Sequence, residues 1–444
     1  MNPTGTSRFS TLEQWLTWQE NLHPRAIDLG LERLKCVLRH LELEHPPYRV
    51  ITVGGTNGKG SSVAFLEAIL RAAGYRVGSY TSPHLLRYNE RIRINTVEVD
   101  DAALCRTFAL IDAVRGEVSL TYFEFATLAA LAIFREAAIE VAILEVGLGG
   151  RLDAVNALDA DAALITTIGI DHVEWLGPDR ESIGREKAGI YRSGRPAICA
   201  DPAPPVSLLE YARAMGARLC CYGSDYGFSR GAQEWAWWNK RRRVEALPLP
   251  ALAGDHQLAN AAAALMTLAT LDGQLPVGVE AIRMGLERAW IAGRLQCIPG
   301  PVEWILDVAH NPQGAMVLAH SLKERPCPGR TGVILGMLSD KDVVGVARAL
   351  ASVANRWYTA TLIGPRGCLA EELVVVLRAA GMTVPVSPFP GVEEACWGAM
   401  QEAEPGDRIV VCGSFYTVAE ALRMGLPGRL PSPPNSVSLE INLG

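Results

Sequence analysis

The sequence has no Cys-x-x-Cys pair and no long apolar run, and these two absences exclude several classes of protein. Its 10 cysteines are scattered along 444 residues, apart from the adjacent pair Cys220 and Cys221. Such spacing argues against a zinc framework and against a disulfide scaffold. Uncharged apolar stretches such as 125–134 are far shorter than the roughly 20 residues of a membrane-spanning helix. Met1–Ser10 contains no apolar signal core, so we expect a cytoplasmic protein.

Excess positive charge is also missing. The chain carries 42 Lys and Arg against 48 Asp and Glu, which gives a formal net charge of −6. This balance argues against a general surface for nucleic acid or anionic membranes, so we expect small-molecule partners. Apolar residues make up 49% of the chain, and its length suffices for two or three packed domains. We expect an ordinary globular protein that is a monomer.

The most informative stretch runs from Ile51 to Ser62 and reads ITVGGTNGKGSS. A β-branched run enters a glycine-rich turn, and an apolar pattern of helical spacing follows from Val63 to Ala73. Glycines let backbone N–H groups converge on phosphate oxygens, and the helix N-terminus adds partial positive charge. Lys59 supplies a full charge, and a hydroxyl such as that of Ser61 can reach a magnesium ion.

This loop departs from the commonest nucleotide-binding loop at two points. Gly60 is inserted between Lys59 and the serine, and only three residues separate Gly54 from Gly58. The loop residues alone therefore leave two interpretations open. They form either a phosphate-binding loop or a glycine-rich turn that merely closes a strand–helix unit.

Polar residues follow several other predicted strands, which lie at Tyr75–Tyr80, Val141–Glu145 and Ala162–Ile168. The ends of these strands lead to Ser82, Glu145 and His172, at the sheet edge where open parallel sheets collect ligands. Because helical patterns alternate with the strands, we expect an α/β fold with a mostly parallel sheet. Those helices are predicted at Leu12–Leu22, Ala26–Leu43, Thr121–Glu136, Glu181–Ile190 and His256–Leu271.

A second α/β pattern begins at Val302. Its strands are predicted at Val302–Val308, Gly332–Met337, Trp357–Ile363 and Arg408–Cys412, with helices between them. We therefore expect an N-terminal P-loop-type ATPase domain at 1–296 and a separate C-terminal Rossmann-like α/β domain at 297–427. The proline-rich remainder, 428–444, is expected to be a flexible tail.

A run of tryptophans and arginines at 235–243 has two interpretations. Aromatic side chains beside basic ones can contact nucleic acid. Alternation that ends in a charged tip is also typical of a solvated β-hairpin, and we favour the hairpin.

Six segments, in this order along the chain, resemble sequence blocks of the Mur ligase superfamily, and within it of the bifunctional dihydrofolate synthase/folylpolyglutamate synthases. The inserted Gly60, which excludes a standard nucleotide loop, is part of that family's ATP loop. The resemblance covers the chain from its first helices to about residue 424. The blocks are 55–61 (GTNGKGS), 82–85 (SPHL), 145–153 (EVGLGGRLD), 171–172 (DH), 185–189 (REKAG) and 307–312 (DVAHNP).

The resemblance implies sites for ATP and for two Mg²⁺ ions in the cleft between two domains. ATP would be bound by Thr56, Asn57, Gly58, Lys59, Gly60, Ser61, Asn260, Arg294 and Asp307, and the metals by Ser82, Glu145 and His172. Lys187 matches a lysine that the family carbamylates, which would turn a cation into a ligand for the second magnesium. His310 is expected to contact the γ-phosphate or to hold the geometry of the cleft.

Six of these residues also have a plainer interpretation. Lys187 alone would be a surface lysine and Asn260 a helix N-cap. Ser82 would be a turn hydroxyl, and His172 a partly buried ring. Asp307 and His310 would be ordinary polar residues at the end of a strand.

For the pterin substrate the resemblance implies three segments, in which stacking residues beside carboxylates suit a flat ring rich in N–H donors. They are Ile27, Asp28 and Leu29; Thr121, Tyr122, Phe123 and Glu124; and Leu152, Asp153 and Ala154. The second segment and Asp153 favour an enzyme that accepts dihydropteroate over one that only elongates folates. Ser414 is a candidate for the glutamate site.

The activity that the resemblance implies belongs to folate biosynthesis and one-carbon metabolism. ATP would phosphorylate the carboxylate of 7,8-dihydropteroate, and L-glutamate would attack the acyl phosphate; reduced folates would be extended in the same way. A cell-wall amino-acid ligase is disfavoured, because such enzymes usually carry an additional N-terminal domain. A nucleotide-hydrolysing switch is disfavoured because its loop would keep lysine beside the hydroxyl.

Overall fold

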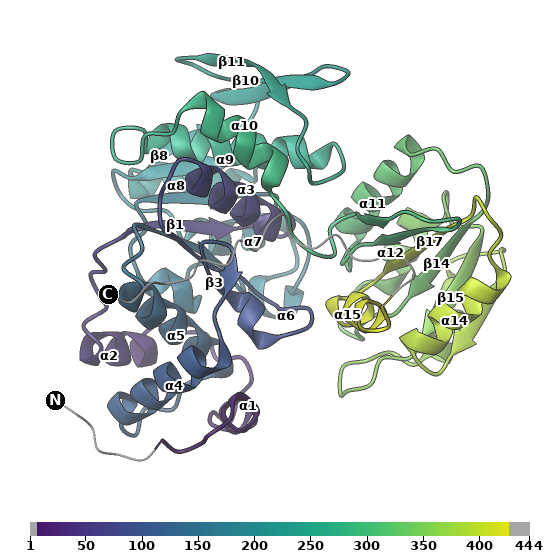
Figure 1. Ribbon diagram of the computed structural model, residues 1–444, viewed down its shortest axis with the longest axis horizontal. Helices are drawn as coiled ribbons and strands as arrows, with labels where there is room; N and C mark the ends of the chain where they lie inside the picture. Colours follow the sequence, from purple (N-terminus) through teal and green to yellow (C-terminus); the bar gives the residue numbers. More distant parts are fainter. Residues whose placement is uncertain (1–6, 426–444) are drawn as a thin grey trace, which may run out of the picture. The chain divides into compact units, whose positions relative to one another are not determined.

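A computed structural model describes residues 7–425 (Figure 1). They form two compact units. The first ends at Pro250 but also contains Asp255–Ala289, and the second contains Ala251–Gly254 and resumes at Trp290. Among the described residues, no helix is both long enough and apolar enough to cross a membrane. The tail predicted at 428–444 lies outside the described residues.

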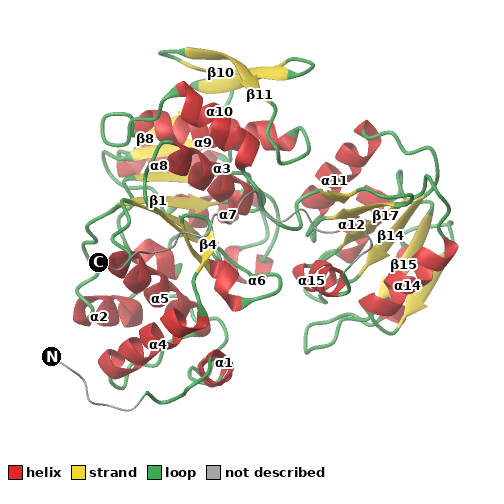
Figure 2. Cartoon of the chain, viewed as in Figure 1, coloured by secondary structure: helices red, strands yellow, loops and turns green. Residues whose placement is uncertain are grey.

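The first unit is built on an eight-stranded sheet in the order β4-β3-β2-β5-β1-β6-β7-β8 (Figure 2). Six strands are parallel, and β3 and β4 add an antiparallel edge, so the mostly parallel sheet is confirmed. Every residue of β5 is buried, as expected for a strand covered on both faces. The strands are β1 Arg49–Gly54, β2 Val77–Tyr80, β3 Ile92–Ile94, β4 Val97–Glu98, β5 Val141–Glu145, β6 Ala162–Ile165, β7 Pro196–Cys199 and β8 Arg218–Cys221.

Helices cover both faces of this sheet (Figure 2). α3 contacts α9 and α10 on one side, and α4 and α5 pack together on the other. Residues 125–134 of α5 are all buried, because this helix is apolar on every side. The helices are α1 Leu12–Glu20, α2 Glu32–His40, α3 Lys59–Ala72, α4 Asp101–Arg115, α5 Tyr122–Glu136, α6 Val173–Leu176, α7 Arg180–Ala188, α8 Val206–Met215, α9 His256–Thr270 and α10 Val279–Arg288, with 3₁₀ turns η1 Tyr88–Arg91 and η2 Ala154–Ala157.

The helix predicted at Ala26–Leu43 is wrong in its first part. α2 begins only at Glu32, and 26–31 form a loop. The Arg33 guanidinium donates to the Asp28 carbonyl at 2.8 Å, so that carbonyl bonds a side chain rather than a helical N–H. Gly30, a poor helix former, follows in the same loop. This correction places the first predicted pterin segment on a loop.

The tryptophan-rich segment forms a hairpin, as predicted, within a three-stranded antiparallel sheet of β9 Tyr226–Arg230, β10 Glu234–Asn239 and β11 Arg243–Pro248. One face of it is not solvated, however. Trp235 and Trp237 are 2% and 1% exposed, and the indole N–H of Trp237 donates to the Ala262 carbonyl of α9 at 3.0 Å. The aromatic residues therefore anchor the hairpin to the first unit.

The second unit has a six-stranded sheet in the order β12-β13-β17-β14-β15-β16, parallel except for β12. The predicted second α/β fold is confirmed, and the short edge strands β12 and β16 are additions to it. The strands are β12 Gln296–Ile298, β13 Glu303–Leu306, β14 Thr331–Leu335, β15 Arg356–Ala360, β16 Val386–Phe389 and β17 Arg408–Cys412. The helices are α11 Pro312–Glu324, α12 Val343–Leu350, α13 Ala370–Ala379, α14 Val392–Glu402 and α15 Phe415–Arg423.

Candidate active site

The glycine loop lies at the carboxyl end of β1, in the middle of the first sheet. β1 ends at Gly54, and α3 begins at Lys59 with Gly58 as its N-cap. Gly58 has a φ of 88°, a left-handed conformation that glycine adopts without strain. Lys59 Nζ donates to the carbonyls of Gly55 and Thr56, each at 3.2 Å. The ammonium group therefore stays beside the positive end of the α3 dipole, where an anion is stabilised.

Residues that follow β6 hold this loop in place. Thr166 Oγ1 donates to the Asn57 carbonyl at 2.6 Å, and Thr56 Oγ1 donates to the Gly169 carbonyl at 3.1 Å. A Cβ at Gly55 would overlap the Thr166 hydroxyl, so this close approach requires glycine. These protein contacts hold the loop in its conformation. The role of Thr166, which lies just beyond β6, was not predicted.

Asn260 reaches the loop from α9, although the two segments are about 200 residues apart. A Cβ at Gly58 would lie 2.6 Å from Asn260 Oδ1, so the amide packs directly on the loop. Asn260 Nδ2 donates to Gln257 at 2.9 Å, and Gln257 Nε2 donates to Ser61 Oγ at 3.3 Å. Asn260 is not a helix N-cap, since Asp255 holds that position. Sequence reasoning missed Gln257, whose spacing of three residues puts it on the same helix face as Asn260.

Lys187 is buried under the loop. Its side chain comes from α7, is 4% exposed, and donates from Nζ to the Gly55 carbonyl at 2.9 Å. Lys59 donates to the same carbonyl, so two lysine side chains converge on one oxygen. Burial, and then the charge of Lys59, lower the pKa of Lys187 to about 7. The plainer interpretation of Lys187 as a surface lysine is therefore wrong.

Two of the three predicted metal ligands lie side by side. Glu145 is the last residue of β5, and one of its carboxylate oxygens accepts from the Ser82 N–H at 3.2 Å. His172 is the N-cap of α6, in the left-handed conformation, with its side chain 36% exposed. Within 7–425 no group of three or more His, Cys, Asp and Glu side chains gathers as a metal cluster. The predicted ligands Ser82, Glu145 and His172 include only two residues of these four types, so they do not form such a group. The Ser82 hydroxyl and the Glu145 carboxylate offer the oxygen ligands that a magnesium ion prefers.

Two of the predicted pterin segments meet through an arginine. Asp28 accepts from Arg33 Nη1 at 2.6 Å, and Glu124 faces Arg33 Nη2 at 3.2 Å. Glu124 also closes the N-terminus of α5, because its carboxylate accepts from the Thr121 N–H at 2.8 Å while the Thr121 hydroxyl accepts from the Glu124 N–H at 3.2 Å. Sequence reasoning missed Arg33.

The aromatic residues of the second segment pack into a cluster. The ring centroids of Tyr122 and Tyr88 are 5.7 Å apart, and those of Phe123 and Tyr80 are 5.8 Å apart. The Arg91 guanidinium lies over both Tyr88 and Tyr122, 5.5 and 5.6 Å from their ring centres. A guanidinium this close to two ring centres is attracted by both rings through cation–π interaction.

Asp153 supports the glycine loop that follows β5 rather than pointing to solvent. It accepts from the N–H of Leu148 at 2.8 Å and from that of Val155 at 3.1 Å, and it is the N-cap of η2, which begins at Ala154. Burial raises the pKa of Asp153 to about 6, against the lowering effect of these N–H donors. Leu152 lies beside it, partly exposed.

The remaining predicted residues lie in the second unit, Arg294 just before β12 and Asp307 and His310 just after β13. Asp307 accepts from the N–H groups of Leu295 and Ala309 at 2.7 and 2.8 Å, and burial raises its pKa. Arg294 lies over the Phe415 ring at 5.1 Å. His310 Nδ1 donates to the Val308 carbonyl at 2.8 Å, which sets its tautomer.

Ser414, the candidate for the glutamate site, is 3% exposed and caps α15. Its hydroxyl accepts from the Thr417 N–H at 3.0 Å.

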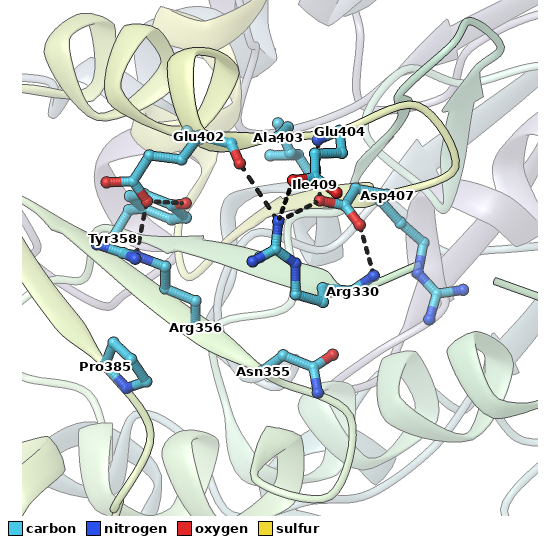
Figure 3. Close-up of a pocket in the computed structure, with 13 residues that line it drawn as sticks. Arg330, Asn355, Arg356, Tyr358, Pro385, Glu402, Ala403, Glu404, Asp407 and Ile409 are labelled. Atoms are coloured by element: carbon cyan, nitrogen blue, oxygen red, sulfur yellow. Dashed lines mark hydrogen bonds and ion pairs between the residues drawn. The ribbon is translucent and has the colours of Figure 1, made fainter. Parts of the chain in front are cut away.

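A cavity of about 300 Å³ lies at the amino ends of strands β14, β15 and β17 of the second sheet (Figure 3). Asp307 and His310, by contrast, follow the carboxyl end of β13. Arg356 pairs with Glu402 at 2.8 Å, and Arg330 pairs with Asp407 at 3.3 Å. Each of these two guanidinium groups thus already faces a carboxylate. None of the described residues that line this cavity is a predicted site residue.

Comparison with known proteins identifies the family. The model described as Mur ligase middle domain matches residues 53–268, and the model described as Mur ligase, glutamate ligase domain, matches 293–415. The dihydrofolate synthase/folylpolyglutamate synthase of Escherichia coli (strain K12) is 46% identical over 415 residues, which cover 94% of this chain and 96% of that protein. The chain belongs to this family of Mur ligases.

Solved structures of the family have the same fold. E. coli FolC in complex with DHPP and ADP is 45% identical with a TM-score of 0.89, over 95% of this chain and 99% of that one. A bifunctional folylpolyglutamate synthase/dihydrofolate synthase with Mn, AMPPNP and L-glutamate bound is 46% identical with a TM-score of 0.87, over 95% and 99%. The resemblance inferred from the six blocks is confirmed. Within the Mur ligase superfamily, the similarity identifies the branch of the dihydrofolate synthase/folylpolyglutamate synthases.

Proposed function

We infer that this chain is an ATP-dependent ligase that joins L-glutamate to 7,8-dihydropteroate, giving dihydrofolate, and that adds further glutamates to reduced folates. The observation that carries this inference is similarity at 46% identity over 94% of the chain to an enzyme of that name. The local geometry supports it, because Lys59 and the glycine loop lie together at the N-terminus of α3, where a phosphate would be stabilised. A cell-wall amino-acid ligase shares only the superfamily.

In the proposed reaction the γ-phosphate of ATP passes to the carboxylate of dihydropteroate, which gives an acyl phosphate and ADP. The amine of glutamate attacks the acyl carbon, and phosphate leaves as the amide forms. Positioning and charge neutralisation supply most of the rate in such transfers. We assign the phosphates to 56–61, and the base, phosphate and ribose contacts to Asn260, Arg294 and Asp307. His310 is placed at the γ-phosphate or in support of the site.

We assign divalent metal to Ser82, Glu145 and His172, with two Mg²⁺ sites. Oxygen ligands with an occasional imidazole suit this ion, and the backbone N–H of Ser82 donates to the Glu145 carboxylate, which brings the two residues together. Bound magnesium would neutralise the phosphate charge. We assign dihydropteroate to the three segments 27–29, 121–124 and 152–154, which contain the carboxylates of Asp28, Glu124 and Asp153 and the rings of Tyr122 and Phe123.

We propose that Lys187 is carbamylated in the active enzyme. Its neutral amine adds to the carbon of CO₂ and loses one proton, which leaves an N-linked carbamate anion. Burial disfavours the ammonium form that would block this reaction, and the adjacent Lys59 cation stabilises the anionic product. The carbamate would be the ligand of the second magnesium.

We expect ADP formation to require a carboxylate acceptor, because the acyl phosphate cannot form without one. ADP release should be slow with ATP, magnesium and glutamate alone, and should rise when dihydropteroate or a reduced folate is added. A coupled assay of ADP measures this directly. Equally fast hydrolysis without an acceptor would instead favour a nucleotide-hydrolysing switch.

We expect Gly58→Ala to weaken ATP binding and to destabilise the protein. Left-handed backbone costs a residue with a Cβ roughly 1–2 kcal/mol, and this Cβ would also press on Asn260 at 2.6 Å. Gly74→Ala is the matched control, since Gly74 has a φ of 92° but nothing within 4 Å of its Cβ position. Thermal unfolding and nucleotide titration should show a loss of stability in both variants and a loss of affinity only in Gly58→Ala. Equal ATP affinity in both would contradict the assignment of the loop.

A further inference from the structure

One arginine joins two segments that are nearly 100 residues apart in the sequence. Arg33, in the first turn of α2, contacts Asp28 twice, at its carboxylate (2.6 Å) and at its carbonyl (2.8 Å). The same guanidinium faces Glu124 of α5 at 3.2 Å. Arginine presents several N–H donors in a rigid plane and so can hold partners on two sides at once.

The burial of these groups makes the link strong. The Glu124 side chain is 4% exposed, and those of Arg33 and Asp28 are 28% and 23% exposed. A buried carboxylate that loses its cation is left with a large desolvation cost, and this applies to Glu124. Asp28 would keep only the more distant His23 and Arg25, each at 3.5 Å, and neither of these pairs with Glu124. Without Arg33, the loop at 27–29 would therefore lose its tie to α5 through this guanidinium.

Arg25 provides an internal contrast. It contacts the same Asp28 carboxylate, at 3.5 Å, but its side chain is 74% exposed. Exposed ion pairs contribute little to stability, because water and salt screen them. The additional contact with the buried Glu124 is what distinguishes Arg33 from Arg25.

We propose that Arg33 is a positioning residue for the pterin ring, which it serves by holding the loop at 27–29 against the N-terminus of α5. This role rests on the proposed function, in which both segments contact dihydropteroate. Arg33 acts through Asp28 and Glu124 rather than on the reacting carboxylate. Its loss should impair the binding of the pterin substrates and spare that of ATP.

The test is steady-state kinetics of the whole enzyme with each substrate varied in turn. In Arg33→Ala we expect the KM for dihydropteroate to rise about tenfold or more, and that for ATP to change by less than about twofold. Arg33→Lys should fall between the wild type and Arg33→Ala, because one ammonium cannot bridge both carboxylates equally well. Arg25→Ala, the matched control, should stay within about twofold of wild type for both substrates.

Thermal unfolding of each variant separates positioning from general stability. If Arg33→Ala does not fold, the comparison is made with Arg33→Lys and Arg33→Gln. An unchanged KM for dihydropteroate, or an equal rise in the KM for ATP, would overturn the role of Arg33 while leaving the ligase activity intact. Absence of dihydropteroate-dependent turnover in the wild type would instead overturn the proposed function, and this role with it.

Discussion

Lys59→Ala is expected to abolish ligation and leave the protein folded. Lys59 brings the one full positive charge of the loop to the N-terminus of α3. Its Nζ donates to two backbone carbonyls of that loop, those of Gly55 and Thr56. Loss of one charged donor aimed at a developing phosphate charge typically costs about a hundredfold to a thousandfold in rate. The apolar core is untouched, so the unfolding temperature should change little.

The measurement for Lys59 is single-turnover formation of ADP and product, with circular dichroism as the check on folding. Lys323→Ala is the matched control, because Lys323 is an exposed lysine in the last turn of α11. Full activity is expected in Lys323→Ala. If Lys59→Ala turned over normally, the assignment of a phosphate site to this loop would have to be abandoned.

Lys187→Ala is expected to lose most activity, by at least about a hundredfold. The lost group is buried beneath the Gly55 carbonyl, beside Lys59, where a carbamate would be held between a cation and bound metal. Removal leaves a space that a small anion can enter. Formate or acetate added to the assay should therefore restore part of the activity. Lys187→Glu should retain some function, limited by its shorter reach.

Two observations separate this account from a simple cationic role for Lys187. The same acids should fail to rescue Lys59→Ala, because that variant lacks a cation rather than an anion. Intact mass measured under gentle conditions should show an increase equal to one CO₂ in the active wild type. An unmodified amine in fully active enzyme would refute the carbamate and make Lys187 a phosphate-facing cation.

The continuous apolar strands were predictable from the sequence, because a strand that is buried on both faces is an uninterrupted run of apolar residues. Val141–Glu145 and Arg408–Cys412 were predicted with the observed bounds. The start of α2 was predicted wrongly. The loop before this helix depends on the contact between Arg33 and the Asp28 carbonyl, and the spacing of apolar residues carries no information about such a contact. The hairpin was also predictable, but its buried face was not, since the helix that covers it comes later in the chain.

The candidate site was predictable where the residues form short blocks. The loop and the strand-end positions of Glu145 and Asp307 follow from local pattern and family resemblance. Thr166, Gln257 and Arg33 were not found, because each acts by reaching a segment about 90 or more residues away. Isolated threonine, glutamine and arginine residues give no local signal of such contacts.

The most direct test of the proposed ligase activity is identification of the product. Purified protein is incubated with ATP, magnesium, 7,8-dihydropteroate and L-glutamate, and the products are analysed by mass spectrometry. We predict dihydrofolate in amounts equal to the ADP released, and longer glutamate chains when a reduced folate replaces dihydropteroate. ADP without any glutamate adduct of either pterin would contradict the account.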